Sequence, residues 1–169
     1  MAALFSWAMV AALGGRTHRM MMGWTEYWLA AAGTWFTGFF PLAEIYVAVP
    51  VGIATGLDPL SVVFWAVLGN FMPVPLIHYG YEQMLRWEWL RKWLTRLNSE
   101  SLQASVNRHG YWFVLIMSPW SGVWIMAVAA KALRLRASIL FWATFKSIAI
   151  YAIALTFLIT AGMEWWTAG

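Results

Sequence analysis

The stretch FPLAEIYVAVPVGIATG, residues 40–56, is the part of the chain that most directly indicates the fold. It is apolar enough to enter a lipid bilayer, yet it carries the acid Glu44. A straight transmembrane helix needs about 20 uninterrupted apolar residues, and a proline removes a backbone donor and disfavours helix in the residue before it. The residues that interrupt the helix here are Pro41, Pro50 and Gly52. Because broken backbone and ionisable groups are tolerated at membrane depth inside protein or beside a cavity, the pattern predicts a re-entrant helical hairpin over about residues 41–57.

The composition is that of an integral membrane protein. The 169 residues are 62% hydrophobic and 11% charged, whereas soluble domains are about 25% charged. The absence of cysteine from the sequence excludes disulfides, thiolate metal sites and thiol nucleophiles. The net charge of +4 does not indicate nucleic acid, because the basic residues lie in short segments beside apolar ones, where orientation in the membrane accounts for them.

About three further segments are predicted to cross the membrane fully, which gives an all-α fold. The first covers residues 24–39, and the third covers about 137–161. The second starts at Asp58-Pro59, where an aspartate cap and a proline at the first position favour a helix start, and it runs to about residue 81. The sequence GNFMPVP, residues 69–75, predicts a break inside this second span.

Residues 110–130 predict a second re-entrant hairpin. Their centre, SPWSG, has the composition of a turn and contains the two expected breakers, Pro119 and Gly122. Basic residues flank the segment on both sides, and the positive-inside rule places both flanks in the cytoplasm. We therefore expect this hairpin to enter and return from the face opposite to the first one. Two opposed hairpins, each followed by a span, indicate an inverted repeat, as in many transporters.

Two segments lie outside this membrane core. Residues 82–97 place tryptophan and leucine on one helical face and basic residues on the other, which is typical of an amphipathic helix in the membrane interface; a connector packed against other protein has the same pattern. Residues 1–22 are expected to be a leader or an interfacial segment, although the methionines at 20–22 leave open an alternative start. The membrane domain is then residues 23–162, and 163–169 form a tail.

The candidate site gathers the polar residues expected at membrane depth. At about 1.5 Å per residue, Asn70 and Lys146 lie roughly 15 Å from the start of their spans, near the midplane. The tip of the second hairpin, with Ser118 and Ser121, is expected at the same level. Since a buried acid and a buried amine each need a partner or water, we expect Glu44 and Lys146 to face one polar cavity that serves as a substrate or proton pathway. The alternative is an ion pair that only fixes packing.

Other chemistry has little support in the sequence. His78 and Glu82 are one helical turn apart, but two ligands do not make a metal site. Ser118 and Ser121 have no catalytic base at a recognisable spacing. We therefore expect no metal, no cofactor and no enzymatic activity.

Several short motifs together indicate a family. They are Pro41–Glu44, Ala48–Gly52, Gly69–Asn70 and Pro73–Pro75 in the first half, and Arg108–Gly110, Pro119–Trp124 and Ala129–Ala130 in the second. Over about residues 35–160, this set resembles the small multidrug export proteins, which are similar in turn to the DedA-type proteins of the VTT superfamily. The resemblance implies paired re-entrant hairpins and proton-coupled movement of amphipathic or lipid-linked cargo.

The chain departs from the family pattern beside its acid. The family usually carries an arginine two positions after the glutamate, where this chain has Tyr46, so the resemblance leaves Lys146 as the cationic partner of Glu44. The second hairpin also lacks the usual second proline and Gly-Thr-Gly run, for which Met117, Trp120 and Ser121 stand in.

These expectations combine into a multi-pass inner-membrane transporter. Protonation of Glu44 is expected to alternate access between the two hairpins and to move an amphipathic or lipid-linked substrate. Membrane lipids and other copies of the chain, or partner membrane subunits, are the expected partners, and nucleic acid is not. The alternative is a non-transporting accessory subunit or assembly factor of a larger membrane complex.

Overall fold

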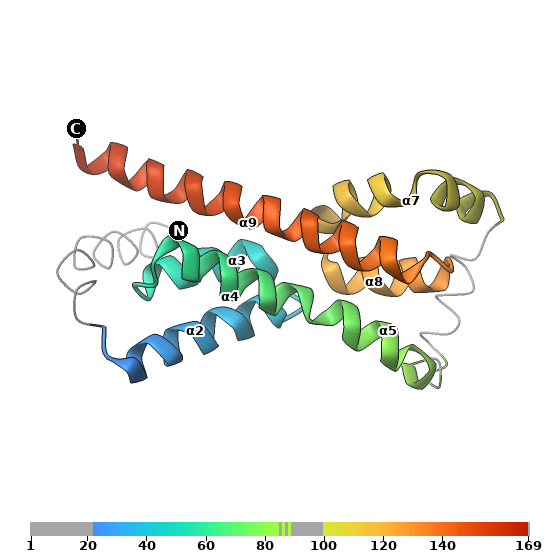
Figure 1. Ribbon diagram of the computed structural model, residues 1–169, viewed down its shortest axis with the longest axis horizontal. Coiled ribbons are helices and arrows are strands. Elements are labelled where there is room, and N and C mark those ends of the chain that lie inside the picture. The colour runs from blue at the N-terminus through green and yellow to red at the C-terminus, as the bar shows by residue number, and fades with distance from the viewer. Residues whose placement is uncertain (1–21, 85, 87, 89–99, 169) are drawn as a thin grey trace. The chain divides into compact units, whose positions relative to one another are not determined.

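The computed structural model describes residues 22–84, 86, 88 and 100–168, and over these residues it is helical, with no strand. The predicted all-α class is confirmed. The helices are α2 (Trp24–Phe39), α3 (Glu44–Ala54), α4 (Pro59–Phe71), α5 (Pro73–Met84), α7 (Glu100–Ser121), α8 (Val123–Ala132) and α9 (Ala137–Ala168) (Figure 1). The chain forms two compact units, one of Met1–Asn70 with Ala149–Gly169 and the other of Phe71–Ile148.

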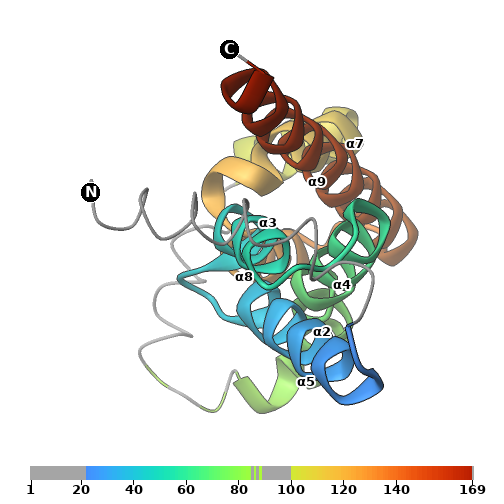
Figure 2. The same cartoon turned by 90° about the vertical axis from the view of Figure 1, so that its left-hand side faces the viewer.

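In the first unit, α2 and α3 form an antiparallel helical hairpin, which Figure 2 shows beside α4. Gly52 of α3 packs closely against the side chain of Thr34. A Cβ added at Gly52 would lie only 3.1 Å from Thr34 Cγ2. At the open end of the hairpin, Met22 is the neighbour of Gly56. The chain turns at residues 40–43, so the tip contains Pro41 and is followed directly by Glu44.

The helix α4 begins as the sequence predicts. Asp58 Oδ1 accepts hydrogen bonds from the backbone N–H groups of Leu60 at 3.1 Å and Ser61 at 3.0 Å, which is the geometry of an N-terminal cap. The predicted break is also present, since α4 ends at Phe71 and α5 starts at Pro73. Along α4, the hydroxyl of Tyr27 on α2 lies 3.2 Å from Ser61 Oγ and accepts a hydrogen bond from Trp65 Nε1 at 3.2 Å.

In the second unit, α7 and α8 contact each other across Gly122, which has a positive φ of 82°. The helix α8 also packs on α5, and Ser147 of α9 donates a hydrogen bond to the carbonyl oxygen of Leu115 on α7 at 2.6 Å. Aromatic rings from α4 and α9 add to this core, since Phe71 packs edge-on against Phe141 and Phe145.

The two units repeat one backbone plan 78 positions apart. In the first, the N–H groups of Gly56 and Leu57 bond the carbonyls of Ile53 and Gly52; in the second, Arg134 and Leu135 bond Lys131 and Ala130 in the same pattern. Both are Schellman motifs, which end a helix with a residue in the left-handed conformation. The buried residues of the short helices also correspond: they are Ile45, Ala48, Val49 and Gly52 in α3, and Val123, Met126, Ala127 and Ala130 in α8. The inverted orientation of the repeat stays a prediction.

The sequence placed two helix breaks wrongly. Residues 41–57 are not a hairpin by themselves, because Pro50 lies inside the single helix α3. Since a proline removes only one i→i−4 hydrogen bond, a short helix with the ring on its exposed side continues through it. Pro119 likewise lies inside α7. The arms of the first hairpin are α2 and α3, so the predicted span over residues 24–39 is one arm of the hairpin.

Two helical stretches among the described residues are long and apolar enough to cross a membrane, Pro59–Gln83 and Ala137–Trp166. The helix α2 has the predicted bounds, but its 16 residues extend only about 24 Å, less than the roughly 30 Å of a bilayer core. A third full span is therefore not supported, and re-entry of the hairpins stays a prediction. The predicted leader at 1–22, apart from Met22, and most of the amphipathic helix at 82–97 lie outside the described residues.

Candidate functional site

Glu44 stands at the tip of the first hairpin in an uncommon conformation. Its backbone φ is +47°, a left-handed value that costs a non-glycine residue about 1–2 kcal/mol. Its side chain is buried, with 8% of its surface exposed. The equivalent position in the second unit is Gly122, whose φ is +82° and for which such a value is unstrained. Strained non-glycine residues are found preferentially at functional sites.

Three helices meet beside this tip because Gly38 has no side chain. A Cβ on Gly38 would lie 2.9 Å from the carbonyl oxygen of Ala66, 3.1 Å from the backbone nitrogen of Asn70 and 3.5 Å from Ala48 Cβ. Ala48 is one helical turn after Glu44 on α3, so both lie on the same face. The tip of the hairpin therefore reaches the level at which α4 ends.

Asn70 supplies a second polar group at this level. Its side chain is 2% exposed, and its Oδ1 has no hydrogen-bond partner among the described residues. A buried acceptor without a partner costs about 1–3 kcal/mol, and such groups in folded proteins often belong to sites that bind water, an ion or a ligand. Asn70 precedes the break at Met72, so its acceptor lies where the helix is interrupted.

The other predicted site residues of the first unit have different surroundings. Tyr46 is 47% exposed and lies two residues beyond Glu44, so it points to another side of α3. Pro41 lies in the turn of the hairpin tip, and Gly52 serves close packing against Thr34 rather than a break. Glu44 and Asn70 are thus the two buried polar members of the predicted site in this unit.

Lys146, Ser118 and Ser121 belong to the second unit. Lys146 is exposed, and its Nζ lies 5.9 Å from the centroid of the Tyr111 ring, within the range of a cation–π contact. Ser118 Oγ donates to the carbonyl oxygen of Val114 at 2.6 Å, and Ser121 Oγ donates to that of Met117 at 2.9 Å. Both hydroxyls are therefore bonded to their own helix. The expected pairing of Glu44 with Lys146 stays a prediction.

The sequence did not reveal one polar contact of the second unit. Lys131 Nζ lies 3.5 Å from His78 Nδ1, and the His78 ring packs edge-on against Phe141 at 5.4 Å between centroids. The signal in the sequence is the basic residue in the last turn of α8, Lys131, but the positive-inside rule explains a basic residue at this place equally well. Within the described residues, no group of three or more His, Asp or Glu side chains could hold a metal ion.

The fold and the site together define a class of protein: an all-α membrane protein built from two hairpin-containing units, with a buried acid at one hairpin tip. Residues 44–154 match a family model described as "Putative small multi-drug export protein". The chain belongs to this family. Neither the curated proteins nor the solved structures contain a match to the chain.

Proposed function

We propose that this protein is a small inner-membrane exporter of amphipathic molecules, coupled to protons through Glu44. The observation that carries this proposal is the buried Glu44 in a strained hairpin tip, close to the level of the Asn70 acceptor, which has no partner in the described part of the chain. The family description supports export of small molecules. A carboxyl group that changes charge inside a membrane domain is a common element of proton relays.

The geometry of the first unit supports a re-entrant hairpin. The arms α2 and α3 have 16 and 11 residues, too few to cross a bilayer singly. The hairpin ends at the level of Asn70, close to the break between α4 and α5. A hairpin that enters and returns would bring Glu44 to the membrane interior, where interrupted helix ends offer polar groups to a substrate.

The proposed cycle uses the charge of this carboxyl group. In the ionised state, Glu44 attracts a cationic substrate and accepts hydrogen bonds from donor groups along the pathway. Protonation from the outer side removes the negative charge, weakens the attraction and releases the substrate. The Asn70 carbonyl oxygen accepts one further hydrogen bond from the substrate or from a water molecule.

The experiment is a transport assay with the full chain in proteoliposomes. Ethidium serves as the amphipathic cation, and a pH-sensitive dye inside the vesicles reports coupled proton movement. We expect the wild type to exchange protons for ethidium and Glu44→Gln to lose both fluxes. Glu26→Gln is the matched control, because Glu26 is an exposed carboxylate in the same unit. Coupled flux in Glu44→Gln at the wild-type rate would remove the mechanism.

A homo-oligomer is the assembly we propose for the exporter. The accessory-subunit alternative requires a larger partner in constant ratio after purification from native membranes. A complex that contains only copies of this chain supports the exporter, and a stoichiometric second protein supports the alternative.

A further inference from the structure

Two loops of this protein have the same backbone and opposite charge. The loop from α3 to α4 and the loop from α8 to α9 are the two Schellman motifs described above. The first carries Gly56 and the acid Asp58. At the same places, the second carries Arg134 and Arg136, and Lys131 precedes them in the last turn of α8. The fold requires the backbone shape at both loops, but it does not require the basic residues at the second.

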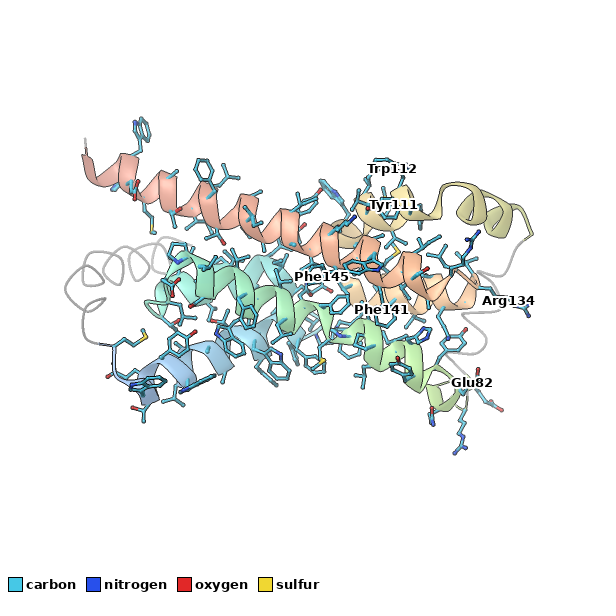
Figure 3. The ribbon with its side chains drawn as sticks, in the orientation of Figure 1. Glu82, Tyr111, Trp112, Arg134, Phe141 and Phe145 are labelled. Carbon is cyan, nitrogen blue, oxygen red and sulfur yellow. The ribbon has the colours of Figure 1, made fainter. Side chains whose placement is uncertain are left out.

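Arg134 occupies a position that suits glycine better. Its φ is +54°, whereas Gly56 at the corresponding position has a φ of +87°. An arginine in the left-handed region is strained and glycine is not, so the fold alone does not account for arginine here. The Arg134 side chain is exposed and extends outward at the end of the second unit (Figure 3).

Lys131 is held in place from a second helix. Its Nζ contacts His78 Nδ1 of α5 at 3.5 Å. Because an ammonium group has donors and no acceptor, lysine is the donor and His78 Nδ1 the acceptor. Glu82 lies one helical turn after His78 and is the acidic residue of α5. It is exposed at the same end of the unit as Arg134 (Figure 3).

The basic loop lies at the depth of lipid headgroups if α9 spans the membrane. The candidate span begins at Ala137, directly after Arg136. Trp142, five residues further, is 61% exposed and lies about 8 Å along the axis, a depth at which tryptophan is enriched. The first backbone N–H groups of the long helix α9 also favour an anion at this end.

We propose that Lys131, Arg134 and Arg136 form a binding site for the phosphate of an anionic lipid headgroup. The site requires the geometry of the α8–α9 loop, and this separates it from the positive-inside effect, which requires only charge on one side of the membrane. The site does not depend on the proposed transport function, because it involves neither Glu44 nor Asn70.

The test measures lipid binding to the purified full-length protein by native mass spectrometry, with phosphatidylglycerol against phosphatidylcholine. We expect preferential retention of phosphatidylglycerol. Arg134→Gly, which relieves the backbone strain and so leaves the fold intact, and Lys131→Gln are each expected to weaken this binding by roughly fivefold. Arg86→Gln is the matched control, since it removes one exposed positive charge outside the loop, and we expect it to change binding by less than about twofold.

Each outcome decides the proposal. A loss in Arg134→Gly and Lys131→Gln, without a loss in Arg86→Gln, supports the site. Equal losses in all three variants would show that net charge alone attracts the lipid and would overturn it. Displacement of phosphatidylglycerol by millimolar inorganic phosphate would identify the ligand as a free anion and would overturn the lipid assignment. Retained phosphatidylglycerol binding in Glu44→Gln would confirm independence from the transport proposal.

Discussion

Glu44 and Gly122 occupy equivalent positions in the two units, and both have a positive φ, +47° and +82°. Each residue directly precedes the first residue of the equivalent buried face, Ile45 in α3 and Val123 in α8. One unit therefore has an acid at the place where the other has the residue that fits the backbone. The two positions are a natural pair for comparing function with stability.

Replacement of Glu44 by glycine should stabilise the protein while it abolishes transport. The substitution removes a left-handed non-glycine residue, which is expected to raise the free energy of unfolding by about 1 kcal/mol. Gly122→Ala should have the opposite effect and lower it by about the same amount. Unfolding in mixed micelles with increasing denaturant measures both. A Glu44→Gly protein that is less stable than the wild type would show that Glu44 interactions outweigh the strain.

Gly69 is expected to be intolerant of any side chain. A Cβ at this position would collide with the backbone carbonyl oxygen of Trp35, so α4 and α2 would have to separate. Overpacking of this kind typically costs 1–3 kcal/mol, and we expect Gly69→Ala to lower the free energy of unfolding by about 2 kcal/mol.

Gly33 provides the control for this experiment. It lies in α2, and no atom would be within 4 Å of a Cβ added there. Gly33→Ala should leave stability unchanged or raise it by up to about 1 kcal/mol through helix propensity. Similar losses in both variants would contradict close packing of α2 on α4.

Asn70 is expected to matter for transport and not for stability. Its buried Oδ1 has no partner among the described residues. Replacing such a polar side chain by an apolar one of similar shape leaves the free energy of unfolding nearly unchanged. Asn70→Leu should therefore unfold within about 1 kcal/mol of the wild type and lose ethidium transport. The measurement combines the unfolding curve with the proteoliposome assay.

Thr144 offers the matched control, because its buried hydroxyl also has no partner among the described residues. Thr144→Val removes this hydroxyl from the second unit and should keep transport. A loss of transport in both variants, or a large loss of stability in Asn70→Leu, would contradict a specific role for the Asn70 acceptor.

Asp58 should make the stability of the first unit depend on pH. Burial alone would raise the pKa of its carboxyl group, but hydrogen bonds from the Ser61 side chain and from the backbone of Ser61 and Leu60 outweigh it and hold the pKa below its ordinary value. A lowered pKa in the folded state means that the contribution is fully present above about pH 4, the unfolded value, and is lost as the pH falls through the lowered value.

The variant Asp58→Ala tests this dependence. At pH 7 we expect it to lose about 1 kcal/mol of stability, the usual value of an N-terminal cap. Below the lowered pKa the difference from the wild type should disappear. Scans of melting temperature at pH 7, 5, 4 and 3 measure the effect, and a constant difference at all four values would show that Asp58 acts by packing and not by charge.

The sequence alone determined the features that depend on local chemistry. The bounds of α2, the Asp58 cap, the break between α4 and α5 and the turn at Gly122 follow from capping residues, prolines and glycines within a few positions. The membrane class follows from composition, because 62% hydrophobic residues are more than a soluble surface accommodates. These signals are properties of neighbouring residues and require no knowledge of the fold.

Only the tertiary structure decided which helix pairs with which and what the polar residues contact. Pro50 appeared to break a helix, but α3 continues through it and pairs with α2. The positive φ values of Glu44 and Arg134 could not be predicted from the sequence, because glutamate and arginine rarely adopt them. The packing of the surrounding helices imposes these conformations. The contact of Lys131 with His78 joins residues that are 53 positions apart, a separation at which residue type carries no information about proximity.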